Sequence, residues 1–592
     1  MSKLGVELHD DFAIFRVWAP FARSVAVRGD FSDWQEKPLA QSDKFAADGV
    51  WEIKIDGVEA GQSYKYAIVG FTGARKDKND PRALALTDGD AGVSVVAADD
   101  FDWGDGEPNF QPVARANQVI YELHVGTFNR LDAATIGTFA TAEQKLDYLR
   151  DLGVTTVELM PVTVMAMGGG GGGWGYSPVA IFAVEDSYGG AAGLKSFVRA
   201  AHARGLAVIL DTVYNHFFSD TLWRFDGWSE NNRGGIYFYN DARGDTPWGG
   251  RPDYGREPVR DFILDNVALW LTDYHIDGLR LDSTIYMRNL NGKNDDPGGD
   301  IADAWKLLQD ITALARKIKP SALMIAEDCA GNAWITKSVE QQGCGFAAQW
   351  DLGLPHVIRD ALGGADPQTQ ADDGRAPNLD NLVNVLQQNF NGDAFQRVIF
   401  ADSHDTAANG GERIVQAVQK DPHDVAARQI AILSSAIALT APGVPMLLAG
   451  SEFLQGGNFN DWNSLDWENV ERFAGVVAAH RHLIALRKNL YGDCGGLASG
   501  EIKIILSDNS AKVLCYQRGG DAAPTIVLAS FNSEKVANYA LTFLPAGDWR
   551  VRFNSSWKGY SADFAELKLD GVNADTTIDL PPYVCLILAK NS

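Results

Sequence analysis

Eight short apolar runs recur through the middle of this 592-residue chain, with helical patterns such as residues 193–205 and 300–319 between them. The runs lie at 118–125, 155–162, 207–213, 278–283, 323–328, 346–350, 397–403 and 444–450. Buried strands that alternate with helices in this number predict a closed (β/α)₈ (TIM) barrel. An open doubly wound sheet is the alternative, but it more often carries a glycine fingerprint after its first strand, and this chain has none.

Strand-like segments with period-two alternation flank this region on both sides, and the chain is too long for one hydrophobic core. They lie at 12–20, 24–31, 49–55 and 62–70 before it and at 501–508, 512–519, 525–532 and 584–590 after it. Residues 107–117 are typical of a linker. We therefore predict an α/β protein with an N-terminal β-sandwich over 1–108, a catalytic barrel over 109–489 and a C-terminal β-sandwich over 490–592.

The composition limits the partners of the chain. A net charge of −25 disfavours nucleic acid and anionic membranes, so a neutral or cationic partner fits better. No apolar run is long enough to span a membrane, and the first residues lack the pattern of a signal peptide. The 5 cysteines are scattered, without metal-ligand spacing. We expect a cytoplasmic protein with reduced thiols, no nucleic-acid partner and no membrane partner.

Polar side chains gather where the predicted barrel strands end. These are Asp211, Asn215 and His216 after the third strand, Arg280 and Asp282 at the fourth, Glu327 at the fifth, and His404 and Asp405 at the seventh. Acidic residues often cap the following helix, and a histidine beside a strand is more often structural. Because the carboxyl ends of all barrel strands meet at one rim, the joint occurrence favours a single polar site there.

Two other kinds of site fit the residues less well. Arg280 would repel a metal ion, and the chain has no HExxH motif; a serine hydrolase would need a G-x-S-x-G elbow, which is also missing. Paired carboxylates suit glycoside cleavage, which needs one ionised and one protonated group. Asp282, close to Arg280, fits the ionised nucleophile, and Glu327, in the apolar context "LMIAE", fits the acid, since burial raises a carboxyl pKa.

The motifs "DTVYNH", "DGLRLDS", "IAED" and "SHD" resemble, in order and spacing, the four signature regions of glycoside hydrolase family 13, the α-amylase family. The resemblance covers nearly the whole chain. It implies that Asp282 is the nucleophile, Glu327 the general acid/base and Asp405 the transition-state stabiliser. It also implies the residues of the glucose subsite, with Tyr176 of "WGYSP" stacking under the sugar: Tyr176, Asp211, His216, Arg280 and His404.

The segment "VWAP…GDFSDW" resembles carbohydrate-binding module family 48, which precedes the barrel in branching enzymes, isoamylases and trehalose-releasing hydrolases. With "YELHVGTF" and "GFAAQWDLGLPHVIRDAL", the chain resembles 1,4-α-glucan branching enzymes most. This implies an α-glucan substrate and transfer to a 6-hydroxyl. Two alternatives stay open: a hydrolase of maltooligosaccharides or maltooligosyl-trehalose, and a non-catalytic glucan-binding protein.

The resemblance implies no nucleotide, flavin or other cofactor. We predict no metal ion in the site, although some relatives hold a structural calcium near the position of Asn215. Two further expectations concern local features of the sequence. The glycine run Gly168–Gly173 is predicted to form a mobile loop over the mouth of the barrel, and Trp34 is expected either to stack on sugar or to pack in the core.

Overall fold

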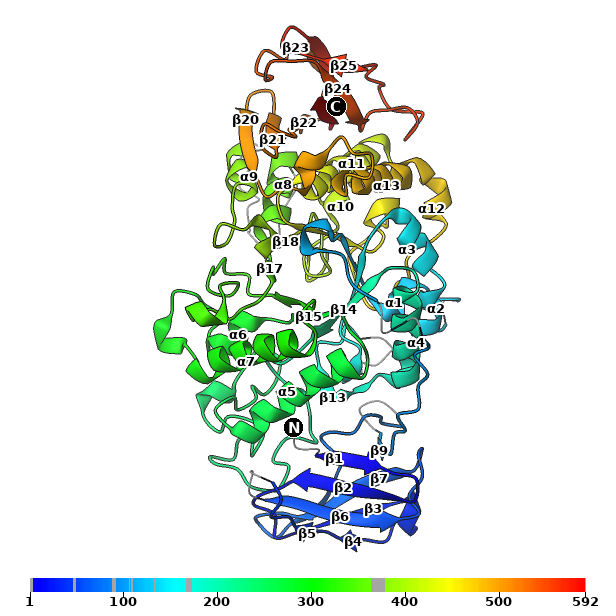
Figure 1. Cartoon of the computed structure of the whole chain (residues 1–592), viewed down its shortest axis with the longest axis vertical. Coiled ribbons are helices and arrows are strands. Elements are labelled where there is room, and N and C mark those ends of the chain that lie inside the picture. The colour runs from blue at the N-terminus through cyan, green and yellow to red at the C-terminus, as the bar shows by residue number, and fades with distance from the viewer. Residues whose placement is uncertain are drawn as a thin grey trace.

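The structure is a computed structural model of the chain, described for residues 4–45, 49–87, 92–105, 107, 110–132, 134–166, 173–363 and 378–590. Figure 1 shows three layers along the long axis, with an N-terminal β domain at the bottom, a barrel in the middle and a C-terminal β domain at the top. The predicted architecture is therefore confirmed. The boundaries at residues 108 and 489 stay predictions.

The barrel is closed by parallel strands in chain order, and β10 pairs with β19 through Ile120 and Met446. Each of the eight predicted apolar runs contains one barrel strand, so the open-sheet alternative is wrong. The strands are β10 (Ile120–Leu123), β11 (Thr156–Leu159), β14 (Ala207–Thr212), β15 (Gly278–Leu281), β16 (Leu323–Ala326), β17 (Ala348–Trp350), β18 (Arg397–Ile399) and β19 (Val444–Leu448).

The longer helices pack around the barrel. The two helical segments that the sequence predicted, 193–205 and 300–319, correspond to α4 and α7. Helix α7 buries Leu307, Leu308 and Ile311 on one face, as its period predicts. The helices are α1 (Val125–Phe128), α2 (Phe139–Glu143), α3 (Leu146–Leu152), α4 (Gly190–His202), α5 (Glu257–Thr272), α6 (Thr284–Arg288), α7 (Ala302–Ile318), α8 (Gly353–Leu362), α9 (Leu379–Leu386), α10 (Ile414–Val418), α11 (Val425–Thr440), α12 (Asn469–Arg472) and α13 (Ala474–Arg487).

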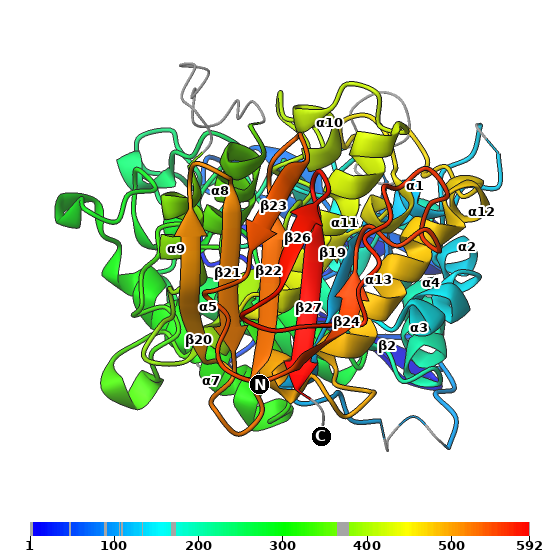
Figure 2. The ribbon, with the colours of Figure 1, turned by 90° about the horizontal axis from the view of Figure 1, so that it is seen from above.

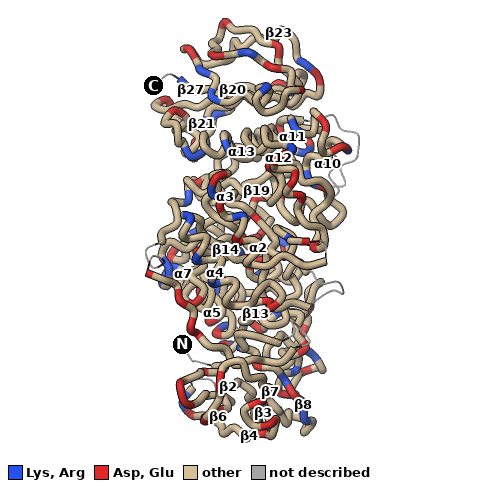
Figure 3. Tube along the Cα trace, turned by 90° about the vertical axis from the view of Figure 1, so that its right-hand side faces the viewer, with Lys and Arg blue, Asp and Glu red and all other residues tan. Residues whose placement is uncertain are grey.

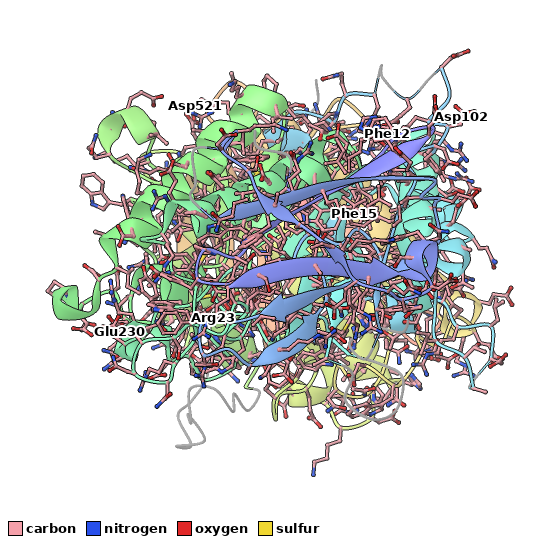
Figure 4. All side chains as sticks on the ribbon, turned by 90° about the horizontal axis from the view of Figure 1, so that it is seen from below. Phe12, Phe15, Arg23, Asp102, Glu230 and Asp521 are labelled. Carbon is pink, nitrogen blue, oxygen red and sulfur yellow. The ribbon has the colours of Figure 1, made fainter. Side chains whose placement is uncertain are left out.

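The N-terminal domain contains two antiparallel sheets. One has the order β1-β2-β6-β5, and the other has the order β4-β3-β7-β8 with β9 added on β7. Figure 4 shows this domain from below, with Phe12 and Phe15 on β2. Phe15 is buried. The strands are β1 (Gly5–Leu8), β2 (Phe12–Trp18), β3 (Ser24–Gly29), β4 (Lys37–Pro38), β5 (Ala40–Gln41), β6 (Val50–Asp56), β7 (Ser63–Val69), β8 (Arg75–Lys78) and β9 (Ser94–Val95).

The C-terminal domain has a six-stranded sheet in the order β20-β21-β22-β27-β24-β25 and a β23-β26 pair. Seen from above, its long strands lie across α11 and α13 (Figure 2). The sequence did not predict β23 to β26. β23 is mostly exposed and lacks an apolar alternation, and β25 has only two residues, whereas the alternation of β24 in WRVRFN is a signal that sequence reasoning missed. The strands are β20 (Ile502–Asp508), β21 (Val513–Arg518), β22 (Thr525–Ser530), β23 (Val536–Ala540), β24 (Trp549–Asn554), β25 (Gly571–Val572), β26 (Thr577–Leu580) and β27 (Cys585–Lys590).

A hairpin of β12 (Thr163–Met165) and β13 (Pro178–Val184), which the sequence did not predict, separates β11 from α4. It brings Trp174 and Tyr176 to the mouth of the barrel, where both lie against His404.

The predicted mobile loop Gly168–Gly173 falls, apart from Gly173, outside the described residues. None of the described helices combines the length and the hydrophobicity that a membrane-spanning segment requires. Both signs of charge occur in all three layers (Figure 3).

Glu107, which the sequence placed in a linker, is buried in a cluster of charged and histidine side chains. Its carboxylate lies 2.8 Å from Nδ1 of His202 and 2.8 Å from Nδ1 of His275. His202 also reaches Asp277 Oδ2 at 2.7 Å, and Lys319 Nζ lies 2.9 Å from Asp277 Oδ1. This cluster joins the segment after the N-terminal domain to the elements that precede β14 and β15, so we call it the linker latch.

We expect Glu107→Ala to lower the melting temperature by about 5–10 °C, because removing one partner of a buried charge cluster costs about 3–5 kcal/mol. Thermal unfolding followed by circular dichroism measures this. Asp99→Ala is the matched control, since Asp99 pairs with Lys195 but its side chain is 75% exposed. Equal melting temperatures for the two variants would contradict the structural role of the latch.

Candidate active site

Arg280, on β15, is the centre of a cluster of carboxylates at the mouth of the barrel. Its Nη1 lies 2.6 Å from Asp211 Oδ2 and 3.0 Å from Asp282 Oδ1. Its Nη2 lies 2.8 Å from Glu327 Oε2 and 3.9 Å from Asp405 Oδ2. The planar guanidinium therefore holds carboxylates from four separate segments around one point.

Exposure divides these residues into two groups. The side chains of Asp282, Glu327 and Asp405 are 15%, 13% and 31% exposed. Arg280 is fully buried, and Asp211 is 3% exposed. The three carboxylates are thus the groups that a ligand can reach, and the other two form the floor beneath them.

The carboxylate of Asp282 is held from both sides. Oδ1 faces Arg280, and Oδ2 accepts a hydrogen bond of 2.6 Å from Asn215 Nδ2. The Asn215 amide oxygen contacts His216 Nδ1, and His216 Nε2 lies 2.9 Å from the backbone oxygen of Tyr176. Burial lowers the pKa of His216 from its usual value, while the nearby Asp282 opposes this effect. Hence the orientation of Asp282 depends on the loop that follows β14 as well as on Arg280.

Glu327 follows β16 and has a different environment. Its Oε2 accepts a hydrogen bond of 2.8 Å from the backbone nitrogen of Ser283, and Cys329 Sγ donates to Oε1 at 3.4 Å. Burial raises the pKa of Glu327 to about 8, and the nearby Arg280 only partly opposes this effect. The carboxyl is therefore protonated at pH 7, as a general acid must be.

Asp405 lies beside a charged histidine. His404 Nε2 is 3.3 Å from Asp405 Oδ1, and His404 Nδ1 is 2.5 Å from Oε1 of Glu122 on β10. Although burial opposes it, the two carboxylates raise the pKa of His404 well above its usual value. Burial would also raise the pKa of Asp405, but His404 outweighs it and lowers that pKa to about 2. Asp405 is thus ionised throughout the ordinary pH range.

Aromatic rings complete the site. The ring of Tyr176 stacks on His404 at 5.2 Å, and its hydroxyl donates a hydrogen bond of 2.6 Å to Asp211 Oδ2. Trp350, on β17, lies under the guanidinium of Arg280 at 4.3 Å. This cation–π contact and the ion pairs restrict Arg280 to one position.

The structure brings together all eight residues that the sequence proposed for this site. Sequence reasoning missed Glu122, Trp350 and Cys329. A signal existed for Glu122, because a charged residue inside the buried run 118–125 needs a partner. Cys329 had no such signal: it lies three residues after the end of β16, and its backbone is in the left-handed region, with φ +60°.

The arrangement supports chemistry by carboxylates. Among the described residues, no three His, Cys, Asp or Glu side chains form a group that could hold a metal ion. One accessible carboxyl, that of Glu327, is protonated and another, that of Asp405, is ionised, and both lie with Asp282 around Arg280. This combination of groups is what cleavage of a glycosidic bond needs.

Family models match three regions of the chain. Residues 123–248 match the model "Alpha amylase, catalytic domain", residues 3–83 match "Carbohydrate-binding module 48 (Isoamylase N-terminal domain)" and residues 504–591 match "Alpha amylase, C-terminal all-beta domain". Each flanking β domain therefore has its own recognisable relatives.

Curated relatives that are 30% identical to the chain include a branching enzyme and a trehalohydrolase. The 1,4-alpha-glucan branching enzyme GlgB of Corynebacterium jeikeium aligns over 93% of the chain and 77% of that enzyme. The malto-oligosyltrehalose trehalohydrolase of Saccharolobus solfataricus aligns over 83% of the chain and 82% of that enzyme. Among solved structures, a putative alpha amylase from Salmonella typhimurium superposes with a TM-score of 0.76 at 20% identity, covering 100% of both chains, which shows a shared fold.

Proposed function

The chain belongs to glycoside hydrolase family 13, the α-amylase family, and acts on glucans; within that family we propose that it is a 1,4-α-glucan branching enzyme. It would cleave an α-1,4 link and transfer the released chain to a 6-hydroxyl. The convergence of Asp282, Glu327 and Asp405 on Arg280 supports cleavage of the glycosidic bond, and the similarity to branching enzymes supports transfer. The reaction follows from the states of these groups.

The first half of the reaction forms a covalent intermediate. Asp282 attacks the anomeric carbon while Glu327 gives its proton to the glycosidic oxygen, and the bond between that carbon and oxygen breaks. Asp405, ionised beside His404, holds sugar hydroxyls and stabilises the oxocarbenium-like transition state. Tyr176 supports the ring of the attacked glucose.

The second half reverses the roles. Glu327, now ionised, takes the proton of an incoming hydroxyl, whose oxygen attacks the anomeric carbon and displaces Asp282. The two inversions retain the anomeric configuration. A 6-hydroxyl from another glucan gives an α-1,6 branch, whereas water gives hydrolysis. The same residues serve both outcomes, so the acceptor decides the product.

The relatives favour transfer. Branching enzymes from several bacteria align over more than nine-tenths of the chain. Hydrolysis of maltooligosyl-trehalose is the second candidate, supported by the relative from Saccharolobus solfataricus.

Incubation with amylose separates the two candidates. A branching enzyme lowers the iodine colour while the number of reducing ends stays nearly constant, and α-1,6 links appear in the proton NMR spectrum. A hydrolase raises the reducing ends in proportion to the loss of colour. Release of trehalose from maltooligosyl-trehalose, without new α-1,6 links, would replace the first proposal by the second.

The pKa of Glu327 predicts the alkaline side of the pH profile. The pH dependence of kcat/KM reports ionisations in the free enzyme, where Glu327 must be protonated to act as the acid. We therefore expect kcat/KM to fall about tenfold per pH unit above roughly pH 8. Asp405, with a pKa of about 2, must be ionised and stays so, so it adds no loss of activity near neutral pH. Initial rates on amylose from pH 5 to 10 measure this, and a flat profile to pH 10 would contradict it.

A further inference from the structure

A groove of about 600 Å³ lies in the C-terminal domain, outside the site described above. One wall is the end of β24, from Val551 to Asn554, and the other is the segment 566–570. Trp557 and Tyr560 line it from the loop after β24, and His482 lines it from α13. The groove is thus formed where the C-terminal sheet meets the last helix of the barrel, near β24 and α13 in Figure 2.

A continuous row of rings leads from this groove to Tyr491, which lies outside the groove lining. Trp557 contacts Tyr560 at 5.1 Å, Tyr560 contacts Phe553 at 5.7 Å, Phe553 contacts His482 at 5.6 Å and His482 contacts Tyr491 at 5.8 Å. The two ends of the row are open to solvent, since Trp557 is 51% exposed and Tyr491 is 61% exposed. The middle rings pack in the core and hold the ends in place.

Trp557 is fixed although it is half exposed. Its indole packs directly against Gly559. A Cβ atom on Gly559 would lie within 2.5 Å of the indole, so the ring and the glycine backbone are in close contact. Tyr560, which packs edge-on against it, is anchored by a 2.7 Å hydrogen bond between its hydroxyl and His482 Nδ1. The backbone of Tyr560 also packs closely against Gly475 of α13. A Cβ atom on Gly475 would lie 2.0 Å from the backbone oxygen of Tyr560. A rigid exposed indole is a preorganised platform for a flat ligand.

The charges around the groove favour a neutral ligand. Arg552 is paired with Asp493 at 3.0 Å, and Lys568 lies 4.0 Å from Glu566. Asp570 is the remaining acidic residue of the lining, so the groove has no excess of positive charge, and the net charge of −25 also disfavours an anionic polymer. A ligand that suits both the rings and the polar rim has flat apolar faces and hydroxyl edges, as a chain of glucose units has.

We propose that this groove is a second, non-catalytic binding site for an α-glucan chain, with Trp557 as its stacking platform. The identity of the ligand rests on the proposed function, since only an enzyme that acts on a long glucan gains from holding the polymer away from the reacting bond. The site would raise the local concentration of substrate without changing the chemistry.

The test compares Trp557→Ala and Trp557→Tyr with wild type in the full-length protein. Electrophoresis through gels that contain glycogen measures retention, and initial rates on glycogen and on maltoheptaose measure KM and kcat. For Trp557→Ala we expect retention to weaken and KM for glycogen to rise by about three- to tenfold, with kcat/KM on maltoheptaose unchanged. Trp557→Tyr should keep most of the retention. Leu490→Ala, which removes another side chain that is 63% exposed, is the matched control.

The outcomes separate this site from the proposed function. If wild type turns over maltoheptaose but Trp557→Ala is retained by glycogen as strongly as wild type, the second site is wrong and the proposed function stands. If wild type acts on neither glucan, the proposed function is wrong. If Trp557→Ala alters the sedimentation of the protein but not its retention, the groove is an interface between copies of the chain, which also overturns the proposal.

Discussion

Asp282→Asn is expected to lower kcat on amylose by about 10⁴-fold or more, because an amide cannot form the glycosyl ester. The substitution keeps the shape of the side chain, and its oxygen can still face Arg280, which lies 3.0 Å from Oδ1 in the native site. The melting temperature is therefore expected to change little. Substrate affinity, measured by retention on glycogen gels, should also persist.

Mass spectrometry of the intact protein tests the role itself. A maltosyl fluoride carrying a 5-fluoro substituent slows hydrolysis of the intermediate, so wild type should gain the mass of one glycosyl group. The labelled peptide should contain Asp282. Asp282→Asn should gain no mass. Label on any other carboxylate, or turnover within tenfold of wild type, would show that Asp282 is not the nucleophile.

The positions of the catalytic carboxylates could be predicted from the sequence because they obey a rule of the fold. In a parallel barrel, every strand delivers the residue after its last apolar position to the same rim. Asp282 and Glu327 are far apart in the chain, yet both directly follow four-residue strands, β15 and β16, which pair with each other. Once the eight apolar runs were recognised, the convergence of their ends required no further information.

The electrostatic floor of the site was harder to predict. The sequence assigned Arg280 to Asp282 alone, whereas its second nitrogen lies 2.8 Å from Glu327. A neighbouring arginine would normally favour the ionised carboxyl, and burial outweighs it here. Whether burial or the arginine determines the pKa of Glu327 depends on how deeply the carboxyl is buried. That burial depends in turn on the hairpin that carries Tyr176 and on the loop after β14. Neither segment has a regular apolar period, so the sequence could not predict it.

The same limit applies to the linker latch. Glu107 stands in a polar, proline-containing stretch that is typical of a solvated connection. Only the folded chain places it between His202 and His275, which come from the ends of two other segments. Contacts between residues far apart in sequence leave no local pattern, so a buried ion cluster of this kind is seen only when the segments have been placed in space.

Glu327→Gln is expected to separate the two chemical steps. With amylose, whose leaving group needs a proton, kcat should fall by about 10²–10⁴-fold. With maltosyl fluoride, whose leaving group needs none, the first step should proceed at close to the wild-type rate. The second step still needs a base, and glutamine cannot supply it. The covalent adduct at Asp282 should therefore accumulate in Glu327→Gln without any 5-fluoro substituent, as an increase in intact mass.

Cys329→Ser is the matched control for this experiment, because it changes the neighbour that contacts Glu327 Oε1 at 3.4 Å while a hydroxyl can still donate there. It should keep the wild-type preference between the two substrates and show no adduct. Because the left-handed backbone at Cys329, φ +60°, is imposed by the fold, serine is expected to be accommodated there. Equal losses on amylose and on the fluoride in Glu327→Gln would mean that the residue orients the sugar rather than transferring the proton. The low exposure of Glu327 and its raised pKa argue against that result, since a group that only binds hydroxyls gains nothing from being kept protonated at pH 7.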